Sequence, residues 1–155
     1  MNYTTYDLRR AQDTLNPRTH ADFMTLSHED DEELETKFPY WFGRIVGIFH
    51  AAVVYIGPGS RSVDPQHMEF LFVRWFGHDS GHQGGWKAKR PHWIGFIDGD
   101  DIAAFGFLDP QEVIRAVHLI PAFHYGRTRD LLPPSHLAHP GRDNDEDWRF
   151  FYVNQ

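Results

Sequence analysis

The amino-acid sequence predicts a mainly β fold: a bent sheet or a small, partly open barrel with one short helix and long loops. Aromatic residues make up 15% of the 155 residues, with 13 Phe, 6 Tyr and 5 Trp, and aromatic side chains favour strands. Runs of aromatic and β-branched residues are short, and they alternate with segments rich in Gly, Pro and Asp. A chain of this length also suits one compact domain.

We expect two regions within one structural unit, an N-terminal arm and acidic loop over residues 1–37 and a β domain over residues 38–155. In the arm, Asn16-Pro17 marks a turn, because the residue before Pro is pushed out of the helical region. Six acids lie in residues 29–35 and four more in residues 143–147. The net charge of −7 therefore reflects two acidic segments, which we interpret as solvated loops, and the rest of the chain is slightly basic.

The first strands begin where the sequence becomes apolar and β-branched. Residues 38–55 predict one long bent strand or two short ones, and Gly43 and Gly47 within them predict a bulge or a tight bend. Residues 68–76, from Met68 to Phe76, form the clearest strand. Neither face of this strand is polar, so we expect a central strand that is buried on both sides.

The second half of the chain predicts shorter elements. Residues 93–97 and 103–108 predict two strands around a hairpin-like turn at 98–101. Asp109 and Pro110 predict a helix start, and so a short helix or helical turn over 110–117. A loop over 126–147 and a final strand over 148–153 complete the chain. The expected core combines large apolar residues from several strands: Ile45, Ile48, Phe72, Val73, Trp75 and Phe151.

Several classes of protein are excluded by composition. The chain has no Cys, so disulfides and thiolate-bound zinc are impossible, and an intracellular location is favoured. No stretch approaches the roughly 20 apolar residues that a membrane helix needs, and we expect a soluble protein without a membrane partner. No cofactor is predicted, since residues 57–60 (Gly-Pro-Gly-Ser) lack the Lys and the helix of a phosphate-binding loop.

Short motifs in the β region resemble the bromo-adjacent homology (BAH) module. That family begins with a strand of the form aromatic-x-Gly-Arg-Ile-x-x-Ile, which residues 41–48 match, and continues with a strand that ends like Val73-Arg74-Trp75-Phe76. Residues 109–114 fit its acidic or Pro turn followed by Val-Ile, and residues 150–153 fit its closing aromatic strand. The resemblance implies a BAH-like β-barrel that binds partners and does not catalyse a reaction.

Nearly the whole chain also resembles a segment of transposon-encoded proteins of mushroom-forming fungi, of the Plavaka and Kyakuja type. Residues 6–20, 81–90 and 107–115 carry this resemblance. It implies a transposon-derived binding module that engages chromatin through a histone tail, DNA or a transposase, with a nuclear location.

The resemblance also implies partner-binding residues. Some BAH modules hold methyl-lysine in an aromatic cage by cation–π attraction. The cage uses a Trp of the second strand, which matches Trp75, and an aromatic residue two positions later, where this chain has Gly77 and no ring. Tyr40, Trp41 and Trp75 are the expected partner or peptide-binding residues.

A nucleic-acid site is predicted in the densest basic stretch of the chain. Lys87, Lys89 and Arg90 would neutralise phosphates, while Trp86 and Trp93 would stack on bases or sugars. The alternative interpretation is a solvated basic loop that the two Trp residues anchor to the core.

A metal-dependent nuclease or other hydrolase is the enzymatic alternative. His78, Asp79 and His82 are weak metal-ligand candidates, because the two His would share one face of a helix. Gly81, Gly84 and Gly85 disfavour that helix, and we predict no metal and no catalytic residue. The Asp residues at 98, 100 and 101 are explained as well by a turn. A purely structural or oligomerising domain is the third possibility.

Overall fold

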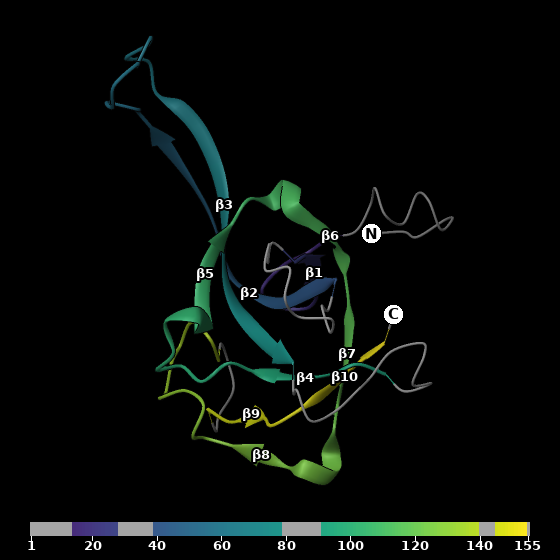
Figure 1. The fold of residues 1–155 in the computed structure, drawn as a ribbon. Helices are drawn as coiled ribbons and strands as arrows, with labels where there is room; N and C mark the ends of the chain where they lie inside the picture. Colours follow the sequence, from purple (N-terminus) through teal and green to yellow (C-terminus); the bar gives the residue numbers. More distant parts are fainter. Residues whose placement is uncertain (1–13, 28–38, 79–90, 140–144, 155) are drawn as a thin grey trace, which may run out of the picture.

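The protein is mainly β, as the sequence predicts. The computed structural model describes residues 14–27, 39–78, 91–139 and 145–154. One bent sheet has the strand order β6-β1-β2-β3-β4-β10-β7, with β5 also paired to β3, and a second, two-stranded sheet joins β8 to β9 (Figure 1). Among the described ranges, there is no helix with the length and apolar character that crossing a membrane requires.

The main sheet is an open one, although its two outermost strands are consecutive in the chain. β6 (Val113–Ala116) pairs with β1, and β7 (His118–Pro121) pairs with β10 at the far end of the sheet. Only Val117 separates them, and its N–H donates to the carbonyl of Asp22 at 3.0 Å. No ladder joins β6 to β7 within the described residues, so the barrel does not close.

The first described strand lies inside the sheet and not in an arm. β1 (Asp22–Leu26) pairs with both β2 and β6, and its residue Phe23 is fully buried. The region over residues 1–37, predicted as an arm and an acidic loop, thus contains a strand of the main sheet. The acidic segment at residues 29–35 lies outside the described residues.

Two long strands form the centre of the fold. β2 (Tyr40–Val53) is one bent strand, paired along its length with β3 (Gln66–His78), and the register shifts between Ile45 and Gly47. This confirms the predicted bend. β3 is central and buried on both faces only near Val73 and Arg74, because residues 66–69 are exposed. We call residues 48–70 the projecting ribbon, since they extend beyond the other strands (Figure 1).

The hairpin expected around residues 98–101 is wrong. β4 (Trp93–Phe96) and β5 (Phe105–Leu108) do not pair with each other, and both pair with β3 at successive positions along it. The Asp-rich turn between them leads into a short 3-10 turn, Ile102–Ala104, which Asp101 caps. The turn residues were identified correctly. However, β4 and β5 follow one another along the same edge of β3 and do not pair with each other as the two strands of a hairpin would.

The expected helix over 110–117 is reduced to a single turn. Asp109 caps it and Pro110 begins it, as predicted, but the 3-10 turn ends at Glu112. Val113 and Ile114 are β-branched, and they continue as β6 because that strand pairs with β1. The loop expected over 126–147 contains the short strand β8 (Arg127–Thr128). The single strand expected over 148–153 is divided into β9 (Asp147–Trp148) and β10 (Phe151–Asn154).

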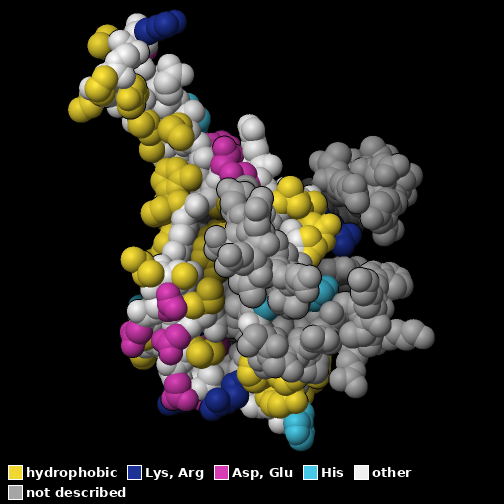
Figure 2. Space-filling view, viewed as in Figure 1, with side chains coloured by type: hydrophobic (Ala, Val, Ile, Leu, Met, Phe, Trp, Pro, Cys, Tyr) yellow, Lys and Arg dark blue, Asp and Glu magenta, His cyan; other side chains and the backbone are white. Residues whose placement is uncertain are grey.

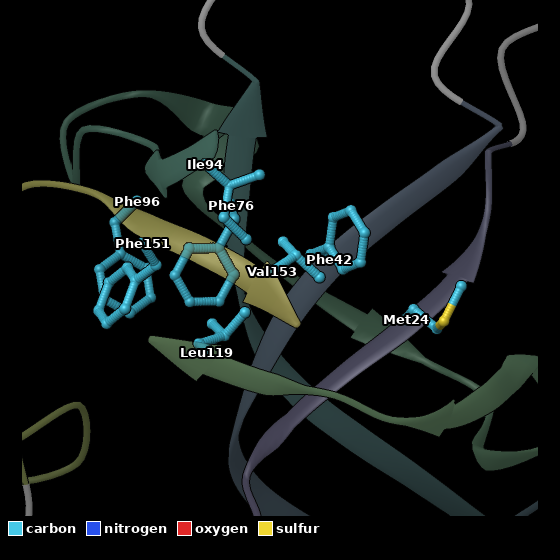
Figure 3. Close-up of a cluster of buried hydrophobic side chains, with 8 residues drawn as sticks. All are labelled: Met24, Phe42, Phe76, Ile94, Phe96, Leu119, Phe151 and Val153. Atoms are coloured by element: carbon cyan, nitrogen blue, oxygen red, sulfur yellow. The ribbon is translucent and has the colours of Figure 1, made fainter. Parts of the chain in front are cut away.

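The core consists of two clusters on opposite faces of the sheet. Adjacent residues Phe23 and Met24 belong to different clusters, as the alternation of a strand requires. Figure 3 shows the larger cluster, to which strands from both halves of the chain contribute: Met24, Phe42, Phe76, Ile94, Phe96, Leu119, Phe151 and Val153. The smaller cluster comprises Phe23, Ile45, Leu71, Val73 and Leu108.

The predicted single core is therefore wrong in part. Ile45 and Val73 are buried together with Trp75 packed against them, but Phe151 lies in the other cluster. Phe72 is only half-buried, and Ile48 is 52% exposed. The bulge after Ile45 separates these two isoleucines, since Ile48 lies on the projecting ribbon, beyond the part of β2 that β1 covers.

Candidate partner-binding surface

The projecting ribbon has one apolar face. Directly paired residues share a face of a ladder, and the pairs Phe49 with Phe70 and Ala51 with Met68 both lie on this one. The opposite face pairs His50 with Glu69. The ribbon is thus amphipathic, although both of its faces lie outside the two core clusters.

The apolar face continues into the body of the sheet as a row of phenylalanine rings. The Phe49 and Phe70 rings stack at 5.7 Å, and Phe107 contacts Phe70 at 5.5 Å and Phe72 at 5.3 Å between ring centroids. Phe72 also stacks on Phe105 at 5.6 Å. We call these five residues the aromatic face.

The aromatic face is open to solvent. Phe107 is 70% exposed and Phe49 is 45% exposed, and the other three rings are half-buried. Figure 2 shows hydrophobic side chains from the ribbon tip down the flank of the molecule. Monomeric proteins rarely expose contiguous apolar patches larger than a few hundred Å², and larger patches mark interaction sites.

Two of the three predicted partner-binding residues come together, on the opposite face of β3 from the aromatic face. The Trp41 and Trp75 rings meet edge to face at 5.8 Å, and Trp75 meets Phe23 in the same way at 5.8 Å. Tyr40 packs instead against the cluster that contains Phe151. Gly77 pairs with Gly95 and places no ring beside Trp75.

The predicted nucleic-acid residues lie mostly outside the described residues. This applies to Trp86, Lys87, Lys89 and Arg90. Trp93 is described, and it is 9% exposed. Its ring packs against Tyr125 and Phe150, each at 4.6 Å, so its faces are covered by the protein's own side chains.

Two of the three weak metal candidates, Asp79 and His82, lie outside the described residues. The Nε2 atom of His78 lies 3.3 Å from the Tyr40 carbonyl oxygen, and burial lowers the pKa of His78. Among the described residues, no group of three or more His, Asp and Glu side chains is arranged to hold a metal ion.

Two of the Asp side chains at the predicted turn accept hydrogen bonds from backbone N–H groups. Asp98 Oδ1 accepts from the Asp100 N–H at 3.0 Å, and Asp101 Oδ1 accepts from the Ala103 N–H at 2.8 Å. These hydrogen bonds support the interpretation of a turn.

A buried charge network escaped the sequence analysis. Arg74 Nη1 donates to Asp147 Oδ2 at 2.8 Å, and His139 Nε2 lies 2.9 Å from Asp147 Oδ1. All three side chains are buried, and the Arg74 guanidinium lies 3.9 Å from the centre of the Phe96 ring. The residues are 73 and 8 positions apart in sequence, so no local pattern links them. Because solvent does not reach the network, we assign it a structural role.

A surface hollow of about 450 Å³ is lined by residues 17–19, 21–22, 44–46 and 137–138. The Arg44 guanidinium on its wall is neutralised by Asp22, through Nε to Oδ1 at 2.6 Å and Nη2 to Oδ2 at 3.0 Å. Because Asp22 already holds Arg44 in two hydrogen bonds, Arg44 is not free to bind an anion in this hollow.

The chain has no match among family models, curated proteins or solved structures.

Proposed function

We propose that the protein is a non-catalytic protein-binding module, BAH-like and transposon-derived, whose partner docks on the aromatic face. The partner is a histone tail or the transposase, which implies a nuclear location. The observation that carries the proposal is Phe107, a large ring that is 70% exposed within a row of five phenylalanines. Covering each such ring in a complex would contribute roughly 1.5–3 kcal/mol.

A binding role also agrees with the chemistry of the surface. The aromatic face contains neither a nucleophile nor a general base, and its five side chains offer only apolar contact. Aromatic residues in the buried centre of an interface supply much of the binding free energy.

The experiment measures the binding of fluorescent peptides that cover the core histone tails and the transposase of a Plavaka-type element. Wild type is compared with Phe107→Ser and with the control Phe123→Ser, since Phe123 is similarly exposed, at 67%, but belongs to a different surface. We expect Phe107→Ser to weaken binding at least tenfold and Phe123→Ser to leave it unchanged. Equal affinity of all three proteins for every bound peptide would contradict the proposal.

Duplex DNA is the separate probe for the nucleic-acid alternative. If DNA binds and its affinity depends on Lys87, Lys89 and Arg90, the log–log salt slope should be shallow, about −0.9 per phosphate contact. Such binding together with no peptide binding would replace the proposed function.

A further inference from the structure

β5 is an edge strand beside the most exposed ring of the aromatic face. In the described part of the chain, β5 pairs only with β3, and its four residues make no backbone hydrogen bond on the other side. Alternate residues of such a strand direct their N–H and C=O groups outward. An open edge of this kind is a template on which another strand pairs.

Carboxylates flank both ends of this strand. Asp98, Asp100 and Asp101 precede it and Asp109 follows it, and all four are exposed. None of the four forms an ion pair with a described residue. Asp98, Asp101 and Asp109 accept hydrogen bonds from backbone N–H groups of their own turns, for example from Gln111 to Asp109 Oδ1 at 2.9 Å. The edge thus presents an apolar centre between two negative ends.

We propose that β5 receives an extended segment of the partner as an added strand, with apolar side chains at alternate central positions and Lys or Arg at both ends. This proposal rests on the proposed function and specifies its ligand. The apolar side chains of the segment would lie beside Phe105 and Phe107, on the face that these two residues share. Its cations would lie near the carboxylates at either end, where opposite charges favour encounter and fix the orientation.

The backbone pairing of the added segment with β5 and the contacts of its side chains can be tested separately. Main-chain hydrogen bonds supply affinity in strand addition, and side chains at alternate positions supply specificity. Replacing a backbone N–H of the ligand by N-methyl removes a donor only where that N–H points toward β5. The effect of N-methylation should therefore alternate along the ligand.

The probe is the peptide Lys-Lys-Val-Thr-Val-Lys-Lys, whose binding is measured by fluorescence anisotropy. Its comparison peptides replace Lys by Glu, or carry N-methyl groups on the two Val residues or on the Thr and one Lys. We expect wild type to bind the Lys peptide and not the Glu peptide. One N-methylated form should lose at least tenfold in affinity, while the other keeps the affinity within about twofold.

The protein variants test the charges. Asp98→Asn combined with Asp100→Asn keeps the oxygen that accepts the turn hydrogen bond, and it should weaken binding about 3- to 10-fold at low salt. The difference should disappear in about 1 M salt, where charges are screened within roughly 3 Å. The control is Asp64→Asn, an exposed carboxylate on the projecting ribbon, which should leave the affinity unchanged.

The outcomes separate this proposal from the function on which it rests. If a histone or transposase peptide binds through Phe107 but the Lys peptide does not bind, the proposed function stands and the added strand is wrong. Equal effects of the two N-methylations would overturn backbone pairing, and unchanged affinity of the double Asn variant would overturn charge recognition. If Phe107→Ser changes no affinity, both proposals fail.

Discussion

Arg44 and Arg74 are directly paired across the β2–β3 ladder, so two guanidinium-bearing side chains lie side by side on one face of the sheet. Each has its own carboxylate, Asp22 for Arg44 and Asp147 for Arg74. Burial lowers the pKa of Arg74, Asp147 opposes that shift, and Arg44 adds to it. The separate carboxylates therefore allow two like charges to remain neighbours within an aromatic part of the fold.

Removing the charge of Asp147 should destabilise the protein strongly. Asp147→Asn leaves the buried Arg74 without its counter-charge, and breaking a buried pair in this way costs about 3–5 kcal/mol. Asp22→Asn should cost less, since the Arg44–Asp22 pair is partly exposed to solvent. Urea unfolding of the two variants and wild type measures both values. Similar midpoints for Asp147→Asn and wild type would contradict the buried network.

Acid should destabilise the protein through two histidines. Burial lowers the pKa of both His78 and His92 below the ordinary value of 6.5. The unfolded chain then binds protons near pH 6.5, whereas the folded state binds them only at lower pH. The stability that the neutral forms of His78 and His92 contribute is present above pH 6.5. It is lost as the pH falls from 6.5 through the lowered pKa values of these two histidines.

Urea midpoints measured from pH 8 to pH 5 check this effect. His78→Phe should reduce the loss of stability between pH 7 and pH 5.5, because it removes one of the two titrating groups. A variant with the same pH dependence as wild type would show that His78 does not contribute.

Two glycines of β2 should respond differently to the same substitution. A Cβ on Gly43 would lie 2.6 Å from the ring of Phe23, which is fully buried and has no room to move. A Cβ on Gly47 would lie 2.5 Å from the ring of Phe49, which is 45% exposed and has solvent on one side into which it can shift. We expect Gly43→Ala to cost about 1–3 kcal/mol.

Gly47→Ala should cost less than about 1 kcal/mol, because the Phe49 ring moves aside and Ala restricts the unfolded chain. Thermal melts of both variants provide the comparison. A more damaging Gly47→Ala would indicate that the bulge itself depends on glycine.

The two isoleucines on either side of the bulge provide a test of the core. Ile45 is 1% exposed and Ile48 is 52% exposed. Ile45→Ala should therefore lower the free energy of unfolding by about 2–5 kcal/mol, while Ile48→Ala should change it by about 0.5 kcal/mol or less. If Ile48→Ala proves equally destabilising, the ribbon packs against the body of the protein in solution.

The long strands were predictable because their signal is local. The predicted spans at residues 38–55 and 68–76 are mostly apolar, with many aromatic residues, and Gly47 marked the bulge. The wrong hairpin has the opposite cause. A segment rich in Gly and Asp predicts a turn, but it does not show which strand pairs with β4 or β5. Both of them pair with β3, which is more distant in sequence.

The helix start at Asp109 was right and its length was wrong for a similar reason. An Asp cap followed by Pro begins a 3-10 turn as well as an α-helix. The pairing of Val113 with Thr25 of β1 then determines the outcome. Short local patterns do not contain that information.

The aromatic face was missed because exposure is not visible in an apolar strand. The sequence of β3 predicts burial on both sides, and a strand that awaits a partner has the same composition as one covered by its own chain. Trp41 and Trp75 were both predicted as partner-binding residues, and the structure places their rings in contact. Tyr40 lies next to Trp41 in sequence, and alternation places it on the other face.

The pairing of β1 with β6, the strand that ends just before Val117, determines when the sheet is able to assemble. β1 is complete once Leu26 is added, but its neighbour β6 ends at Ala116. During translation, one edge of β1 therefore waits for about ninety further residues to be added, and β10 completes the other end of the sheet later still. Pairings over such separations fold slowly, on the scale of milliseconds to seconds. The nascent chain thus exposes an unpaired strand edge until these residues are added, and such an edge favours aggregation.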